Sequence, residues 1–158
     1  MAIDYELILA ADVEPDRLLG FVEDALGLAH ERDADFHSAV GTATVGRRAE
    51  GFNLVARRPT DMKTQHLEEW AGIKGRAKVR FIIDKACDTR QAFLRLLAAT
   101  LGVLEQVPGD AALILNGEHV WLLRRGGHLA LKDDPRVFDG AALALVRVPY
   151  ELCPLPSA

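Results

Sequence analysis

The chain lacks the local motifs that mark most enzymes and metal-binding proteins. It has only two cysteines, Cys87 and Cys153, and neither belongs to a C-x-x-C or Cys/His arrangement, so we expect no zinc site. Two isolated thiols suit a reducing compartment. The G-x-S-x-G, P-loop and G-x-G-x-x-G fingerprints are also missing, so neither a hydrolase nucleophile nor a phosphate-binding loop is predicted.

Long apolar runs are missing too. The residues after Met1 lack the basic region and the apolar stretch of a secretory signal peptide, and no later run approaches the length that crosses a bilayer. We therefore expect a cytoplasmic protein with no membrane contact. At 158 residues and 49% hydrophobic content, the chain is predicted to form one globular domain spanning residues 1–158.

The five histidines give no metal signal, because no two of them stand four residues apart as in a helical metal site. His66 and Glu69 are three residues apart, but such pairs arise by chance on any solvated helix. We assign no catalytic residue, metal or cofactor. An enzyme would require a pocket in which His66 or His119 meets an acid.

Charge is unevenly distributed along the chain. Residues 1–35 hold ten acids and two bases, whereas residues 36–95 hold six acids and twelve bases. Such a distribution gives either opposed surface patches, which steer charged partners, or two segments that neutralise each other in the fold.

The basic middle of the chain supplies an alternative function, a small-molecule or nucleic-acid binding module. Two features argue against nucleic acid: no aromatic set for base stacking interleaves these bases, and the net charge is −4. The bases of this stripe are Arg47, Arg48, Arg57, Arg58, Lys74, Arg76, Lys78 and Arg80.

Hydrophobic periodicity predicts most of the regular elements. Alternating apolar residues favour strands, whereas apolar residues three and four apart favour helices that begin at Pro15 and after the capping residue Asp88. The expected strands are 3–11, 38–47, 52–56 and 77–84, the expected principal helices are 14–26 and 88–107, and part of 60–75 is a candidate short helix.

Residues 108–131 predict a three-stranded meander with turns at Asn116-Gly117 and Gly126-Gly127, dipeptides that tolerate positive φ. Two-residue turns place Leu115 opposite Glu118 and Leu113 opposite Val120, with Val120 on the face under the helices. The opposite face then carries Ala112, Ile114, His119, Trp121, Leu123, Ala130 and His128, and is only half polar.

The C-terminal stretch is one candidate cover for that face. Asp139 is positioned to cap a short helix over 141–146, and the prolines that follow forbid regular structure. Tyr150, Leu152 and Leu155 are apolar enough to dock there. The alternative is an exposed face that binds a partner.

These elements predict an α+β fold: a mainly antiparallel sheet of about six or seven strands with two principal helices packed on one face. The expected order is β-α-β-β-β-α-β-β-β. The segment 60–75 is long for a plain connector, and long ordered loops are often functional. Its Trp70 is either a core residue or an interface anchor.

Several stretches together resemble a known family. They are Ile3-Asp4-Tyr5-Glu6-Leu7, the early helix, Pro108-Gly109-Asp110-Ala111 leading into Leu113 to Glu118, Leu122 to Gly127, and the ending Val148-Pro149-Tyr150-Glu151-Leu152. They resemble the immunity proteins of the bacterial swarm-inhibition (Sit) toxin–immunity pairs, of the third type, over nearly the whole chain.

The resemblance implies a cytoplasmic protein that binds and neutralises a cognate protein toxin and needs no active site. Such a protein requires a stable scaffold with a complementary, often charged, surface. Charge and loop position then select the candidate contact residues: Asp33, Asp35, Glu68, Glu69 and Trp70.

Overall fold

The structure is a computed structural model that describes residues 3–32, 44–59 and 62–157. The strands are β1 (Ile3–Leu9), β2 (Thr44–Ala49), β3 (Phe52–Arg57), β4 (Ala77–Ile83), β5 (Ala111–Leu115), β6 (His119–Arg125), β7 (His128–Lys132) and β8 (Tyr150–Cys153). The helices are α1 (Pro15–Leu26), α2 (Met62–Ala71), α3 (Thr89–Gln106) and α4 (Gly140–Leu143).

All the described strands join one sheet in the order β2-β3-β4-β1-β5-β6-β7-β8. Every neighbouring pair is antiparallel except β7 and β8, which are parallel. The predicted α+β class is confirmed, with one strand more than expected. Of the strand expected over 38–47, the first six residues lie outside the described residues, and β2 begins at Thr44.

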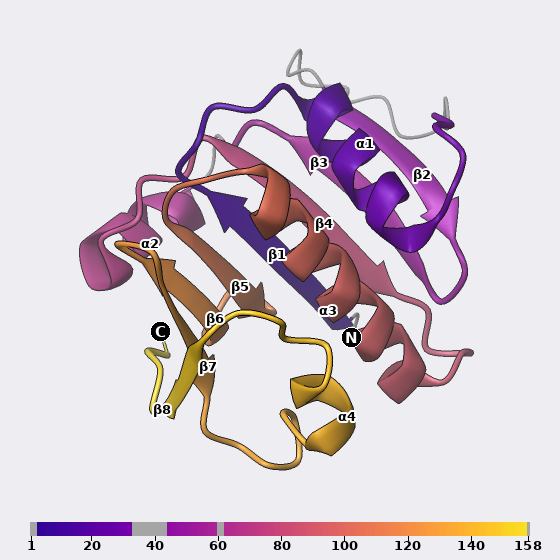
Figure 1. Cartoon of the computed structure of the whole chain (residues 1–158). Coiled ribbons are helices and arrows are strands. Elements are labelled where there is room, and N and C mark those ends of the chain that lie inside the picture. The colour runs from indigo at the N-terminus through magenta and orange to yellow at the C-terminus, as the bar shows by residue number, and fades with distance from the viewer. Residues whose placement is uncertain (1–2, 33–43, 60–61, 158) are drawn as a thin grey trace.

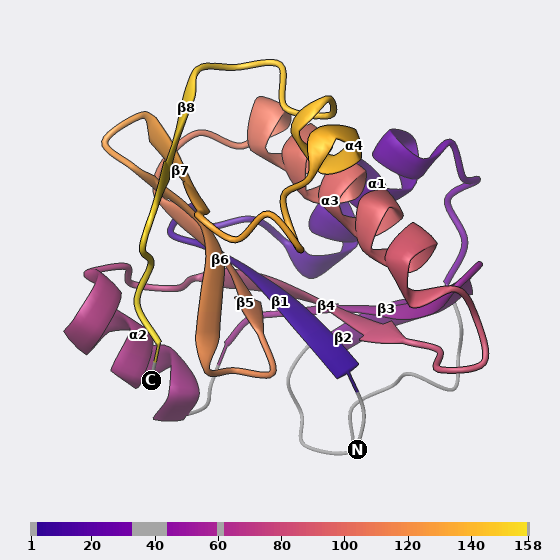
Figure 2. The same ribbon diagram turned by 90° about the horizontal axis from the view of Figure 1, so that it is seen from below.

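Helices lie on both faces of the sheet (Figures 1 and 2). α1 and α3 pack side by side on one face, as predicted for the two principal helices, and α4 lies beside α3. α2 lies on the opposite face, near the end of the chain. We call the α1/α3 side the inner face and the α2 side the outer face.

The two principal helices begin and end where the sequence indicates. Pro15 occupies the first turn of α1, where its missing N–H costs nothing, and Gly27 ends the helix in a left-handed conformation with φ 68°. Asp88 caps α3, because its carboxylate accepts hydrogen bonds from the backbone N–H groups of Arg90 and Gln91.

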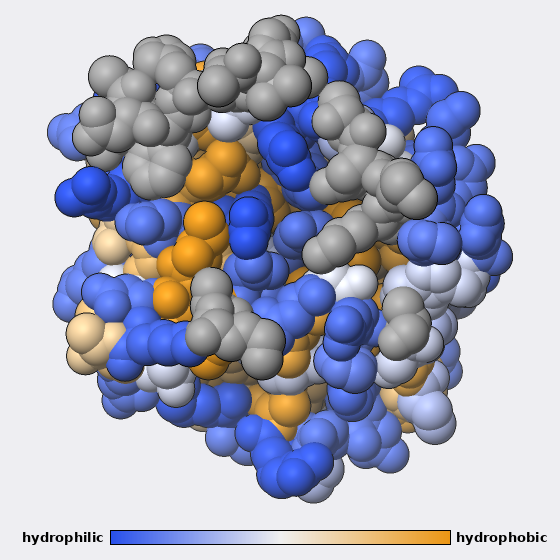
Figure 3. Space-filling model, turned by 180° about the vertical axis from the view of Figure 1, so that it is seen from behind, coloured by the Kyte–Doolittle hydropathy of each residue, from blue (hydrophilic) through white to orange (hydrophobic). Residues whose placement is uncertain are grey.

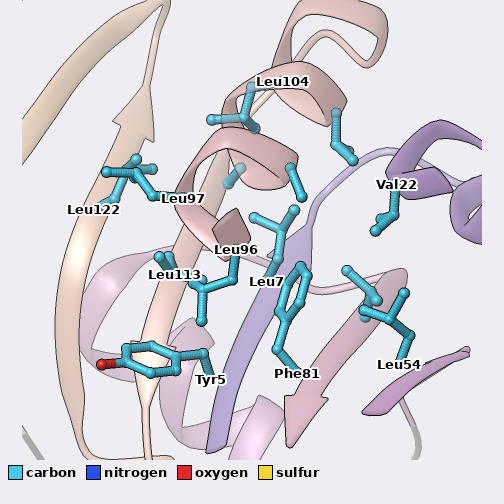
Figure 4. Close-up of a cluster of buried hydrophobic side chains, with 14 of the residues drawn as sticks. Tyr5, Leu7, Val22, Leu54, Phe81, Leu96, Leu97, Leu104, Leu113 and Leu122 are labelled. Atoms are coloured by element: carbon cyan, nitrogen blue, oxygen red, sulfur yellow. The ribbon is translucent and has the colours of Figure 1, made fainter. Parts of the chain in front are cut away.

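The main core lies between the inner face and these helices (Figure 4). Leu96 and Leu97 of α3 point toward side chains of the central strands, among them Leu7 and Leu113. α1 and α3 approach closely at Gly102, where an added Cβ would lie 2.6 Å from the Cβ of Ala25. A glycine is therefore required at this helix contact.

A second, smaller core lies on the outer face under α2. Leu67 and Ala71 of α2, with Ile73 beyond it, pack on Ile8, Ala112, Ile114 and Val120 of the sheet. The outer face of the meander is thus covered mainly by α2.

The predicted meander register is wrong between Asn116-Gly117 and Leu113. Asn116 and Gly117 do adopt positive φ, but Leu115 pairs with His119 and Ile114 with Val120, after which the register shifts so that Leu113 pairs with Leu122. Trp121 is the extra residue of this β-bulge. Since a bulge turns the following side chains over, Val120 lies on the outer face and Trp121 on the inner face.

Aromatic packing explains the position of Trp121: its ring meets those of Tyr5 and Phe93 edge to face, at centroid distances of 5.2 and 5.4 Å. The register at Gly126-Gly127 is as predicted, with Leu122 opposite Leu131.

The expectation that prolines forbid regular structure near the C-terminus is wrong. β8 fits between Pro149 and Pro154 and runs parallel to β7 (Figure 1). Beyond β8, the carbonyl of Pro156 accepts a hydrogen bond of 3.1 Å from the N–H of Val120, so the chain continues along β6 where β7 ends. Leu155 docks on the outer-face core as expected, but Tyr150 and Leu152 are exposed.

Candidate partner-binding surface

The acidic first segment and the basic middle segment neutralise each other in the fold. On the outer face the Glu6 carboxylate lies 3.5 Å from Lys78 Nζ, and Asp4 pairs with Arg80. Arg58 pairs with both Asp12 and Glu14. Charged side chains consequently alternate with apolar ones across much of this face (Figure 3). Of the two readings of the charge pattern, the structure favours mutual neutralisation.

Glu23 is the centre of a buried ionic cluster on α1. Its side chain is fully buried, and its carboxylate accepts hydrogen bonds from Arg32 at 2.5 Å, Arg47 at 2.7 Å and the N–H of Glu31 at 3.0 Å. A buried charge is tolerated only when it is paired and hydrogen-bonded. The cluster ties the segment after α1 to β2.

This pairing removes support for the basic stripe. Four of its eight bases, Arg47, Arg58, Lys78 and Arg80, form ion pairs with acids from residues 1–35. Since phosphate binding depends on cations that can replace counterions, bases already paired with carboxylates contribute little. Lys74 and Arg76 remain exposed near one another.

α2 positions three of the five predicted contact residues. Glu68 and Glu69 are exposed, and Trp70 is half-buried against the outer-face core. The indole Nε1 of Trp70 is buried without a hydrogen-bond partner in the described part of the chain. The packing of Trp70 favours its role as a core residue. Asp33 and Asp35 lie outside the described residues.

The histidines of the described residues lie on or near the surface, and His37 lies outside those residues. His66 Nδ1 lies 3.5 Å from a Glu69 oxygen with both side chains more than 60% exposed, and His119 contacts Ser157 at 3.1 Å. Over residues 3–32, 44–59 and 62–157, no three His, Cys, Asp or Glu side chains gather as a metal site would require.

A surface that the sequence analysis missed lies along the C-terminal segment 145–153, which we call the C-terminal strap. It carries Val148, Tyr150 and Leu152, which are 49%, 39% and 42% exposed and are the large exposed hydrophobic side chains of the described residues. Tyr150 and Leu152 are apolar residues predicted to dock on the outer face, but in the structure they are exposed. Exposed apolar side chains clustered on one segment are a mark of interaction sites.

A pocket of about 590 Å³ separates the strap from the end of α3. Its apolar wall comes from Leu101 and Leu104 of α3, Leu129 of β7, and Leu145 and Tyr150 of the strap. A volume of this size is in the range of sites that hold small molecules or large side chains.

Arg124 also lines this pocket, and its guanidinium binds the carbonyl groups at the end of α3. Its guanidinium donates hydrogen bonds to the carbonyl oxygens of Leu104 at 2.7 Å and Gly109 at 2.8 Å, and also to that of Val107. Carbonyls at a helix C-terminus lack partners within the helix and attract a cation. Burial lowers the pKa of Arg124 from its ordinary value, and the nearby Asp110 carboxylate opposes that shift.

The C-terminal strap also contains the second cysteine. Burial raises the pKa of the Cys153 thiol, and the Glu151 and Asp133 carboxylates raise it further. An activated thiol needs a lowered pKa, and the pKa of Cys153 is shifted in the opposite direction. No helix among the described residues is long and apolar enough to cross a membrane.

Comparison with known protein families decides the classification of this arrangement. A family model described as SitI3-like matches residues 3–141, most of the chain. The chain belongs to the SitI3-like family. The match begins with β1 and ends inside α4, so the ending Val148–Leu152, which the resemblance also included, lies beyond the matched residues. Neither a curated protein nor a solved structure matches the chain.

Proposed function

We propose that this SitI3-like protein is an immunity protein that binds a cognate bacterial toxin in the cytoplasm and neutralises it by stoichiometric contact. The observation that carries the proposal is the family match over residues 3–141. Inhibition by contact needs a rigid scaffold and an accessible complementary surface, and no catalytic group.

The scaffold fits that requirement. One sheet with helices on both faces is fixed by two apolar cores and by the buried Glu23 cluster. A rigid partner loses little conformational entropy on binding, which favours tight association.

The acidic residues Asp33, Asp35, Glu68 and Glu69 are the proposed first contacts with a cationic region of the toxin. Support comes from the exposure of Glu68 and Glu69 on α2, where neither is consumed in the ion pairs that neutralise the first segment. Exposed charges of one sign accelerate capture of a partner of opposite sign. Trp70, the fifth candidate, supports this surface from beneath.

The deciding experiment is co-expression with the product of the adjacent upstream gene, scored by host survival and by co-purification. Rescue of growth together with a stable one-to-one complex is the expected result. An upstream product that is not toxic and forms no complex would overturn the proposal. Oligonucleotide binding with strong salt dependence would instead favour the basic-module alternative.

A further inference from the structure

We propose that the C-terminal strap is the specificity-determining docking edge for the toxin: an extended toxin segment pairs with β8, places an apolar side chain in the pocket beside Leu104, and sets a basic side chain against Glu151. This inference rests on the proposed function and adds the place and mode of binding.

The first support is the position of β8 at the end of the sheet. β8 pairs with β7 on one side, and no described element lies beyond its other side (Figures 1 and 2). The Cys153 carbonyl accepts a hydrogen bond of 3.1 Å from the N–H of Asp133, and so points toward β7. Because successive residues of a strand point their polar groups to opposite edges, those of Tyr150 and Leu152 face the open edge.

The second support is the pattern of side chains on β8. Tyr150 is paired with Leu129 and Leu152 with Leu131, both inner-face core residues, so Tyr150 and Leu152 project on the inner-face side. There Tyr150 joins the wall of the pocket. A partner strand added to β8 would continue this row with its own alternate side chains, and strand addition gains its specificity from such alternate pockets.

The third support concerns charge and weighs against a second copy as occupant. In the antiparallel register that pairs Tyr150 of one copy with Leu152 of another, the two Glu151 side chains would stand opposite each other. Like charges directly opposite destabilise a strand pair. Glu151 is exposed and has no ion pair with any described residue. A basic residue of a different protein would therefore pair with it favourably, whereas a second Glu151 would repel it. Pro149 and Pro154 keep the open edge short, which limits non-specific pairing.

The fourth support is the exposure of the strap, which carries the large exposed hydrophobic side chains of the described residues. An immunity protein that must discriminate among toxins needs contacts that only its own toxin satisfies, and apolar side chains left exposed on one segment can supply them.

The test uses the full chain and, as probe, the purified product of the adjacent upstream gene. The double variant Tyr150→Ala/Leu152→Ala is compared with Lys85→Ala/Gln91→Ala, which changes two exposed residues between β4 and the first turn of α3. We expect the strap variant to raise Kd about 100-fold, as loss of two central contacts does, and the control to change it by less than about threefold. Melting temperatures verify that both variants remain folded.

A second measurement identifies the mode of docking. Amide hydrogen exchange of Tyr150 and Leu152 should slow markedly in the complex, because both N–H groups gain partners from the added strand. Suppose that the wild type binds the toxin. An unchanged Kd in the strap variant, or unchanged exchange at both amides of the wild type, would then overturn this inference and leave the proposed function intact. A wild-type homodimer that the strap variant dissociates would also overturn it. Absence of wild-type binding would overturn both.

Discussion

The guanidinium of Arg47 on β2 donates a hydrogen bond of 2.7 Å to the carboxylate of Glu23 on α1, whose side chain is fully buried. This contact joins the acidic first segment of the chain to its basic middle inside the molecule. The stability of the fold therefore depends on an ion pair between two residues that are 24 positions apart in the sequence.

Arg47→Met should lower the free energy of unfolding by about 2–4 kcal/mol, because among the described residues Glu23 then keeps only Arg32 as a charged partner in a buried site. Urea denaturation measures the loss. Arg58→Met is the matched control: its partners Asp12 and Glu14 are exposed, so its effect should be small. Equal losses of unfolding free energy in both variants would contradict a stabilising role for the buried Glu23–Arg47 ion pair.

Gly102→Ala should destabilise the protein by about 1–3 kcal/mol, although alanine is the better helix former. The new Cβ would lie 2.6 Å from the Cβ of Ala25, so α1 and α3 must separate. Adding Ala25→Gly should restore part of the stability. Gly140→Ala is the control, because an added Cβ there meets no atom within 4 Å. Thermal melts of the four proteins check the expectation.

Trp70→Phe should leave the free energy of unfolding within about 1 kcal/mol, because it keeps an aromatic ring at this position and removes a buried N–H that has no described partner. Leu67→Ala, which empties a fully buried position beside it, should cost about 2–5 kcal/mol. Toxin affinity of Trp70→Phe should match that of the wild type. A clear loss of affinity with unchanged stability would make Trp70 an interface anchor instead.

Replacing Asp33, Asp35, Glu68 and Glu69 by lysine should slow association with the toxin at least about tenfold at low salt and reduce its salt dependence. The reason is loss of attraction between these carboxylates and a cationic toxin surface. Stopped-flow mixing over a range of ionic strengths measures the rate. Unchanged affinity in this quadruple variant would remove all four residues from the interface.

The quadruple variant requires a control with the same change in net charge. Four other exposed acids, reversed together, should slow association much less if the effect is local. These are Asp24, Glu50, Asp84 and Glu118.

Asp139 gives the fold a pH-dependent contact. Its Oδ1 accepts a hydrogen bond of 3.0 Å from the N–H of Ala142, and this bond, with the nearby Arg90 guanidinium, lowers the pKa of the Asp139 carboxyl. A lowered folded-state pKa contributes stability above the unfolded-state value and loses it as pH falls through the folded one. The wild type should therefore have a larger free energy of unfolding than Asp139→Asn near neutral pH. This difference should disappear at acidic pH, as urea denaturation at a series of pH values would measure. A difference independent of pH would contradict the assignment.

Much of the fold could be predicted because local signals agreed with tertiary packing. β1 and β4 alternate cleanly, and α1 and α3 carry their own capping residues, Gly27 and Asp88. The bulge at Trp121 gave no such signal, because it arises from packing of its ring against Tyr5 and Phe93, residues distant in sequence.

The candidate surface was only partly predictable, for similar reasons. Charge marked Glu68 and Glu69, and the structure leaves both exposed on α2. The prolines of the C-terminal segment predict no regular structure there, so the sequence did not indicate the strand in the strap. Proline removes only its own N–H, so the four residues between Pro149 and Pro154 still form a strand.

The central position of β1 in the sheet also has a kinetic consequence. Ile3 pairs with Ile83 and Tyr5 with Leu115, so β1 leaves the ribosome well before either of its partner strands. Folding dominated by such distant pairings is slow. Until residues 111–115 have been synthesised, at least one edge of β1 stays unpaired, and an unpaired strand edge is open to pairing with other chains.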